Sequence, residues 1–237
     1  MTERAYLDWN ATAPLRPQAR AAMAAAMEVV GNPSSVHAEG RAARQILETA
    51  RERVAVAVGA EPRDVVFTSG GSEANAVALS RAIEHAGAAC NVAMASDIEH
   101  VSVLVGGDFP SVERFGASRD GVASVAELQG RLKAAAGKGA KPLVALMAAN
   151  NETGVIQPVR EAAELVHAAG GLLHVDAVQA LGKILLDIRQ LGADLLSVSA
   201  HKIGGPMGVG ALVLGSDKLH VRAFGKILDC PGNPFTH

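Results

Sequence analysis

The sequence predicts an α/β fold in which a mainly parallel sheet is flanked by helices, and two observations support this prediction. Short apolar, β-branched runs alternate with longer alanine-rich amphipathic stretches along the 237 residues, which is typical of βαβ units and parallel strands. Several of the apolar runs also end in polar side chains. Strands behave in this way when the carboxyl edge of a sheet carries a binding site.

The elements follow from these periodicities. Helices are expected at residues 17–30, 36–58, 72–85, 125–136 and 159–169. Strands are expected at residues 65–68, 91–95, 112–115, 143–148, 172–175, 195–199 and 209–214. No helical stretch separates the last two strands, so we expect them to pair antiparallel.

Composition excludes several classes of function. The chain has 22 basic and 24 acidic side chains, so it lacks the positive charge of a nucleic-acid-binding protein. The apolar run at residues 143–149 is far shorter than the ~20 residues of a membrane span, and the first residues do not resemble a signal peptide. Cys90 and Cys230 form neither a disulfide framework nor a metal-ligand pattern. We therefore expect a cytoplasmic protein without a metal, nucleic-acid or membrane partner.

A lysine follows one of the predicted strands directly. The run 195–199 leads to Lys202, and the glycine-rich segment 203–210 comes next. Asp176 follows the strand at 172–175 in the same way. A lysine and an aspartate at neighbouring strand ends indicate a cationic heteroaromatic cofactor between them, and the alternative is a buried salt bridge. Five strand ends carry polar groups, more than a packed core tolerates without a ligand, and this favours the cofactor.

The segment 67–75 connects a strand to a helix and contains Gly70, Gly71 and Ser72. Free amides at the glycines and a hydroxyl at the helix start would form an anion cradle. The alternative is a simple capped turn. The lysine of a Walker loop is missing.

Three further side chains follow strands. His100 could stack on a ring and exchange protons near neutral pH, or it could be structural. Asn151 could bond to a ring oxygen or to a substrate, whereas for Asn150 we favour a turn. Gln179 lies three residues after Asp176, close enough to share its ligand.

Together, these segments resemble the cysteine desulfurases, the NifS/IscS-like group of class V aminotransferase-type enzymes. The matching segments, in family order, are YLDWNATAP at 6–14, GNPSSVH at 31–37, TSGGSEAN at 68–75, EH at 99–100, NNETG at 150–154, HVDAVQ at 174–179 and SVSAHK at 197–202. The resemblance implies the large domain of a pyridoxal-phosphate (PLP)-dependent transferase of the aspartate aminotransferase type. It also implies a homodimer that converts L-cysteine, or a similar amino acid, to L-alanine and passes sulfur to an acceptor protein, as in iron–sulfur cluster assembly.

The resemblance also implies a role for each site residue. Lys202 would bind PLP as an imine and move protons on the substrate carbon, and Asp176 would keep the pyridine nitrogen protonated. His100 would stack on the ring and act as an acid or base. The remaining residues would contact the ring hydroxyl and substrate (Gln179, Asn151) or the phosphate (Gly71, Ser72, Ser199, His201).

The resemblance stops after about residue 219. The family continues into a C-terminal small domain that supplies a nucleophilic cysteine and a substrate-binding arginine, and neither Cys90, which we expect to be buried, nor Cys230 matches that cysteine. We therefore divide the chain into an N-terminal segment (1–15), a PLP-binding large domain (16–219) and a divergent tail (220–237), and expect PLP binding to be weak. Two alternatives stay open: a truncated, inactive PLP-binding or dimerisation paralogue, and a related PLP-dependent lyase.

Overall fold

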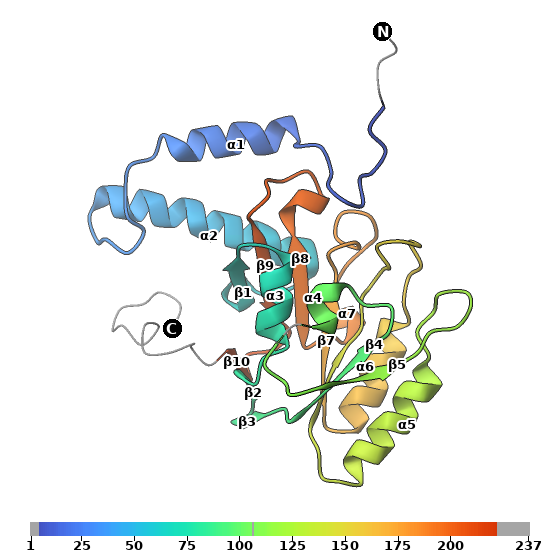
Figure 1. The fold of residues 1–237 in the computed structure, drawn as a ribbon. Helices are drawn as coiled ribbons and strands as arrows, with labels where there is room; N and C mark the ends of the chain where they lie inside the picture. Colours follow the sequence, from blue (N-terminus) through green and yellow to red (C-terminus); the bar gives the residue numbers. More distant parts are fainter. Residues whose placement is uncertain (1–4, 106, 222–237) are drawn as a thin grey trace.

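The computed structural model describes residues 5–105 and 107–221, and its centre is a seven-stranded sheet (Figure 1). The order of strands across the sheet is β1-β9-β8-β7-β6-β4-β5. Their bounds are β1 (Val65–Thr68), β4 (Val92–Ser96), β5 (Val112–Phe115), β6 (Pro142–Ala145), β7 (Leu172–Asp176), β8 (Leu195–Ser199) and β9 (Gly210–Leu214). Strands β4 to β8 pair parallel, whereas β9 is antiparallel to both β8 and β1. Six of these strands therefore end at the same edge.

Helices cover both faces of the sheet. One face packs against α2 (Ala38–Val58), α5 (Val125–Ala136), α6 (Val159–Ala168) and α7 (Ile188–Leu191), which contribute buried apolar side chains to one core cluster. The other face packs against α3 (Gly71–Ala78) and α4 (Val101–Leu104). A small second sheet, in the order β10-β2-β3, lies beyond α3 (β2 Ile83–His85, β3 Ala88–Ala89, β10 Leu219–Val221). The observed fold class is the predicted one.

Local chemistry explains where the long helices start and stop. The His37 ring accepts a hydrogen bond from the Gly40 amide at the start of α2, and Gly59 ends the helix with φ +71°, a conformation that favours glycine. The Ser124 hydroxyl accepts from the Glu127 amide at the start of α5. Two single-turn 3-10 helices, η1 (Pro62–Asp64) and η2 (Ala200–Lys202), precede β1 and follow β8.

The N-terminal segment lies along the residues that follow β8. The Ala13 amide donates to the His201 carbonyl at 2.8 Å, and the Arg16 amide donates to the Gly204 carbonyl at 2.9 Å. Helix α1 (Pro17–Met27) comes next, and none of its residues is buried. This path brings residues 8–12 over the carboxyl edge of the sheet.

Most predicted elements are observed, although three of them end earlier than expected. The antiparallel pairing of β8 and β9 is confirmed. The helix expected at 72–85 ends at Ala78, because the Ser80 hydroxyl caps the Val77 carbonyl at 2.8 Å and the chain then pairs with β10. The helix expected at 17–30 ends at Met27, since β-branched residues and the Gly-Asn-Pro sequence follow. The strand expected at 143–148 is regular only to Ala145, although the amides of Leu146 and Ala148 still donate to the His174 and Asp176 carbonyls of β7.

The short elements η1, β2, β3, α4, α7, η2 and β10 were not predicted. The tail expected at 220–237 begins inside β10, and its remaining residues, with Cys230, lie outside the described residues. Among the helices described in residues 5–221, none is long and apolar enough to span a bilayer.

Candidate active site

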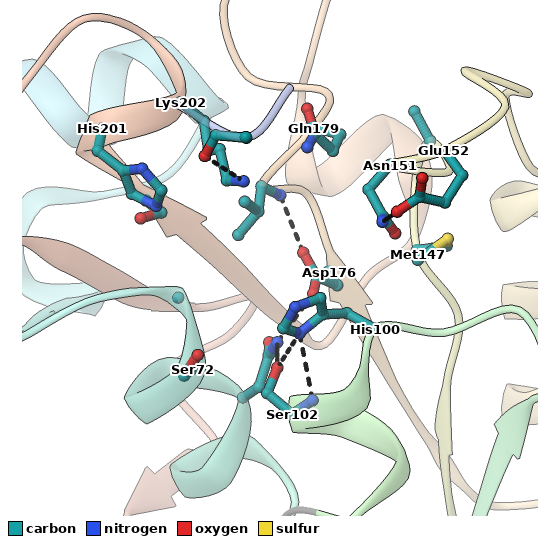
Figure 2. A pocket seen from close by; sticks show the side chains of 16 residues that line it. Ser72, His100, Ser102, Met147, Asn151, Glu152, Asp176, Gln179, His201 and Lys202 are labelled. Carbon is teal, nitrogen blue, oxygen red and sulfur yellow. Dashed lines mark hydrogen bonds between the residues drawn. The ribbon is translucent and has the colours of Figure 1, made fainter. Parts of the chain in front are cut away.

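A cavity of about 290 Å³ lies at the carboxyl edge of the sheet, where β1, β7 and β8 end. Its wall brings together every site residue expected from the sequence: Gly71, Ser72, His100, Asn151, Asp176, Gln179, Ser199, His201 and Lys202. Figure 2 shows side chains approaching the same space from separate helices, strand ends and loops. Parallel strand ends converge at one edge, and this explains why residues far apart in the chain meet here.

Lys202 lies at the end of η2, and its amine faces the N-terminal segment. Its Nζ donates to the carbonyls of Asn10 at 2.6 Å and Ala11 at 2.9 Å. Partial burial lowers the pKa of Lys202, while the negative charges of nearby carboxylates, Asp176 first among them, act in the opposite direction. A lysine with a lowered pKa has a larger neutral fraction, and the neutral amine is the nucleophilic form.

Asp176 is the last residue of β7 and is 6% exposed. Its Oδ1 accepts from the Val178 amide at 3.0 Å, and its Oδ2 accepts from Asn75 Nδ2 at 2.8 Å. Burial raises the pKa of Asp176, whereas these two hydrogen bonds and the charges of His100 and Lys202 favour the carboxylate. A buried carboxylate of this kind is well suited to face a cationic N–H group.

A hydrogen-bonded chain connects Asp176 to His100. Asn75 Nδ2 also donates to Ser102 Oγ at 3.0 Å, and Ser102 Oγ lies 2.7 Å from His100 Nδ1. The Ser102 amide donates to the same ring nitrogen at 3.2 Å. Because Nδ1 accepts from this amide, the Nε2 atom is the one that remains for a ligand. Neither Asn75 nor Ser102 was predicted as a site residue, although Asn75 lies in the segment 67–75.

The start of α3, where the sequence predicts an anion cradle, lies at the wall of the cavity. Gly71 and Ser72 line the cavity beside Ser199, which is 3% exposed. A Cβ at Gly71 would lie 2.8 Å from Val178 Cγ2, so this position needs glycine if the helix is to approach β7. His201 faces the same side, and burial followed by the charge of Lys202 lowers its pKa. Amides, hydroxyls and an imidazole here could bind a phosphate.

The loop after β6 contains a buried, structural asparagine and a half-buried one that lines the cavity. Asn150 Oδ1 accepts from the Glu152 and Thr153 amides at 3.0 Å and 2.9 Å, which confirms the predicted turn. Asn151 lines the cavity, and its Nδ2 donates to Glu152 Oε1 at 2.6 Å.

Two buried ionisable residues near the site were not predicted as site residues. Glu99 Oε1 accepts from the Met147 amide at 2.7 Å, while its Oε2 has no partner among the described residues. Burial raises the pKa of Glu99 to about 8, and the negative charge of Asp176 adds to this increase. His174 Nε2 lies 2.9 Å from Ser197 Oγ, and burial lowers the pKa of His174 to about 3. Neither residue lines the cavity; Glu99 lies near enough to Asp176 to sense its charge, and His174 precedes Asp176 by two residues on β7.

Cys90 is 3% exposed, as expected, and is not among the cavity residues. Burial raises the pKa of its thiol to about 11, so the thiol is not poised as a nucleophile. Within the described part of the chain, no three His, Cys, Asp or Glu side chains are grouped to hold a metal ion.

A mixed, mostly parallel sheet with helices on both faces and a polar cavity at its carboxyl edge is the architecture of the PLP-dependent transferase fold. The family described as aminotransferase class-V matches residues 5–230. The chain belongs to this family.

Similar proteins agree with this assignment. A cysteine desulfurase of Cereibacter sphaeroides is 43% identical over 220 residues, covering 90% of this chain and 55% of that protein. A selenocysteine lyase of Bos taurus is 38% identical over 244 residues, covering 89% and 55%. The crystal structure of a NifS-like protein from Rickettsia africae superposes with a TM-score of 0.81 at 29% identity, covering 95% of this chain and 62% of that one. The chain thus spans about half the length of the curated relatives it matches.

Proposed function

We propose that the protein is a PLP-dependent cysteine desulfurase-like enzyme. It would convert L-cysteine and an acceptor thiol to L-alanine and the acceptor persulfide, breaking the carbon–sulfur bond of cysteine. The observation that carries this proposal is the placement of Lys202 and Asp176 in one cavity beside the glycine-opened start of α3. The similarity to cysteine desulfurases supports the choice of substrate.

The residues present fit pyridoxal phosphate. Asp176 offers a buried carboxylate to a pyridinium N–H, and Gly71, Ser72, Ser199 and His201 offer donors for a phosphate. Lys202 offers the amine for the covalent bond. The volume of about 290 Å³ lies near the lower end of the range of about 300–1,000 Å³ for small-molecule sites. We assign cofactor binding to residues 16–219 with the N-terminal segment over the site.

Each side chain of the site would have a separate role in the proposed reaction. When bound, PLP supplies an electron sink for bond breaking at the substrate carbon, and the negative charge of Asp176 keeps its ring nitrogen protonated. Lys202 would leave the carbonyls of Asn10 and Ala11 to react, and its neutral amine would then carry protons at the substrate carbon. His100, fixed through Nδ1 by Ser102, would offer Nε2 to the cofactor ring and as a proton carrier. Gln179 and Asn151 would contact the ring hydroxyl and the substrate.

A second copy of the chain is the partner we propose for the exposed apolar side chains near the N-terminus. Leu7, Trp9, Met27, Val30 and Val36 are between 56% and 88% exposed. Exposed apolar side chains in such numbers are typical of an interface between subunits. Light scattering tests this proposal: a homodimer supports it, and a monomer at micromolar concentration contradicts it.

The experiment that tests the function adds PLP to the purified protein and then L-cysteine together with a small-molecule thiol as the sulfur acceptor. We expect a visible absorbance band that the Lys202→Ala variant lacks, and alanine formed only from the cofactor-loaded wild type. A band of equal intensity in Lys202→Ala, or no band in the wild type, contradicts the proposal. The similarity to a selenocysteine lyase favours L-selenocysteine as a second substrate, and the same alanine assay compares the two amino acids.

A further inference from the structure

Lys183 has no role in the proposed reaction and does not line the cavity, but its amine donates hydrogen bonds to residues of the site. Its Nζ donates to Asn10 Oδ1 at 2.9 Å and to Gln179 Oε1. Gln179 lines the cavity, and Asn10 carries the carbonyl to which Lys202 is bonded. A second lysine therefore holds the two groups next to the reactive amine.

The contact with Lys183 fixes the orientation of the Gln179 side-chain amide. An ammonium has only donors, so it can face only the Oε1 end of the carboxamide. The Nε2 end then donates to the Asn10 carbonyl at 2.8 Å. Figure 2 shows Gln179 beside Lys202, with its nitrogen turned towards the interior of the cavity. Without Lys183, only the Asn10 carbonyl would distinguish the two amide ends, and Lys202 competes for that carbonyl.

The two lysines bond to different oxygens around Asn10. Both amines lie next to Asn10, one on its side chain and one on its backbone carbonyl. Lys183 also bonds to Gln179 Oε1, whereas Lys202 bonds to two backbone carbonyls that it must give up before it reacts.

We propose that Lys183 is a positioning residue of this site: it holds Gln179 and Asn10 so that the Gln179 NH₂ group is turned to the Asn10 carbonyl beside Lys202. The proposal deepens the proposed function and rests on it for the role of Lys202. Lys183 itself does not touch the substrate or the reacting atoms. Its side chain acts through Gln179 and Asn10.

The two ammonium groups also repel each other. Burial lowers the pKa of Lys183, and the charge of Lys202 lowers it further. The charged groups facing Lys202 besides Lys183 are Asp176 of β7, Asp8 of the N-terminal segment, Glu152 of the loop after β6 and, when protonated, His201. The charge of Lys202 therefore disfavours the charged form of Lys183, and the hydrogen bonds to Gln179 and Asn10 hold the ammonium in place against this repulsion.

Competitive acylation of the cofactor-free protein tests this inference independently of PLP. The purified protein reacts with trace acetic anhydride over a range of pH, and mass spectrometry follows the peptide that contains Lys183. We expect the pH midpoint of Lys183 labelling to fall by about 0.4–1 pH unit in Gln179→Ala, because the ammonium loses one acceptor. Lys138→Met, at an exposed lysine of the turn after α5, is the matched control and should leave the Lys183 midpoint unchanged. An unchanged or raised midpoint in Gln179→Ala overturns the inference.

PLP titration supplies a second readout. We expect Lys183→Met to bind PLP about 3- to 10-fold more weakly than the wild type, the loss of one net hydrogen bond. In a Gln179→Ala background, the same Lys183→Met substitution should weaken PLP binding less than it does in the wild type, because one of the two groups through which Lys183 acts is gone. Equal weakening in both backgrounds overturns the role through Gln179. If the wild type binds no PLP, the proposed function fails, whereas the acylation result still decides the role of Lys183.

Discussion

Replacement of Glu99 by glutamine should make the protein more stable at alkaline pH. Glu99 is 6% exposed and receives one hydrogen bond, from the Met147 amide to Oε1. The side-chain oxygen of glutamine in the Glu99→Gln variant can still accept this hydrogen bond, and the side chain does not ionise. Ionisation of the wild-type residue, by contrast, places a second buried negative charge near Asp176.

The magnitude follows from the difference between the folded and the unfolded chain. The pKa of Glu99 is about 8 in the fold against an ordinary value of 4.5. The folded protein therefore holds a proton that the unfolded chain has released, and stability falls as pH rises through this window. At about 1.4 kcal/mol per pH unit, raising the pH from about 5 to about 8 removes about 3 kcal/mol.

Urea denaturation at several pH values measures this effect. The wild type should lose about 3 kcal/mol of unfolding free energy between about pH 5 and about pH 8 that Glu99→Gln retains. The control is Glu113→Gln, at an exposed glutamate of β5, which should keep the pH dependence of the wild type. Parallel stability curves for the wild type and Glu99→Gln would refute the reasoning, because Glu99 would then titrate as an exposed carboxyl group.

Three further predictions concern buried groups. Asn75→Ala removes the donor to the buried Asp176 carboxylate and should lower the free energy of unfolding in urea by about 1–3 kcal/mol; a change below about 0.5 kcal/mol would contradict this. The Cys90 thiol, with a pKa of about 11, should be alkylated by iodoacetamide far more slowly in the fold than in urea, as followed on its own peptide; equal rates would mean that it is accessible. His174 has a pKa of about 3, well below the ordinary 6.5, so the unfolded chain binds its proton first and stability falls as pH drops below about 6.5. His174→Asn should reduce this loss in acid urea titrations, and an unaltered slope would contradict the assignment.

The strands and the polar residues at their ends were predictable because both correspond to local sequence patterns. The apolar run 195–199 and the lysine that follows it place an amine at a sheet edge. The segment 172–176 does the same for Asp176. Parallel strands then bring these ends together, so nine residues from five segments could be assigned to one cavity.

The connections between these residues were not predictable, because they depend on side chains that meet across elements. Asn75 sits in a helix, where an asparagine usually faces solvent, and only the packing of α3 against β7 turns it to Asp176. Asn10 and Lys183 are 173 residues apart, and no local pattern indicates their hydrogen bond. The end of α3 at Ala78 was missed for a similar reason, since pairing of β2 with β10 is a long-range contact.

The position of the covalent bond to PLP tests the central claim most directly. The protein is incubated with PLP, reduced with borohydride and digested, and mass spectrometry locates the pyridoxyl group. We predict one stoichiometric modification on Lys202, absent from Lys202→Ala. A pyridoxyl group found on Lys183 or spread over surface lysines, with Lys202 unmodified, would contradict this claim.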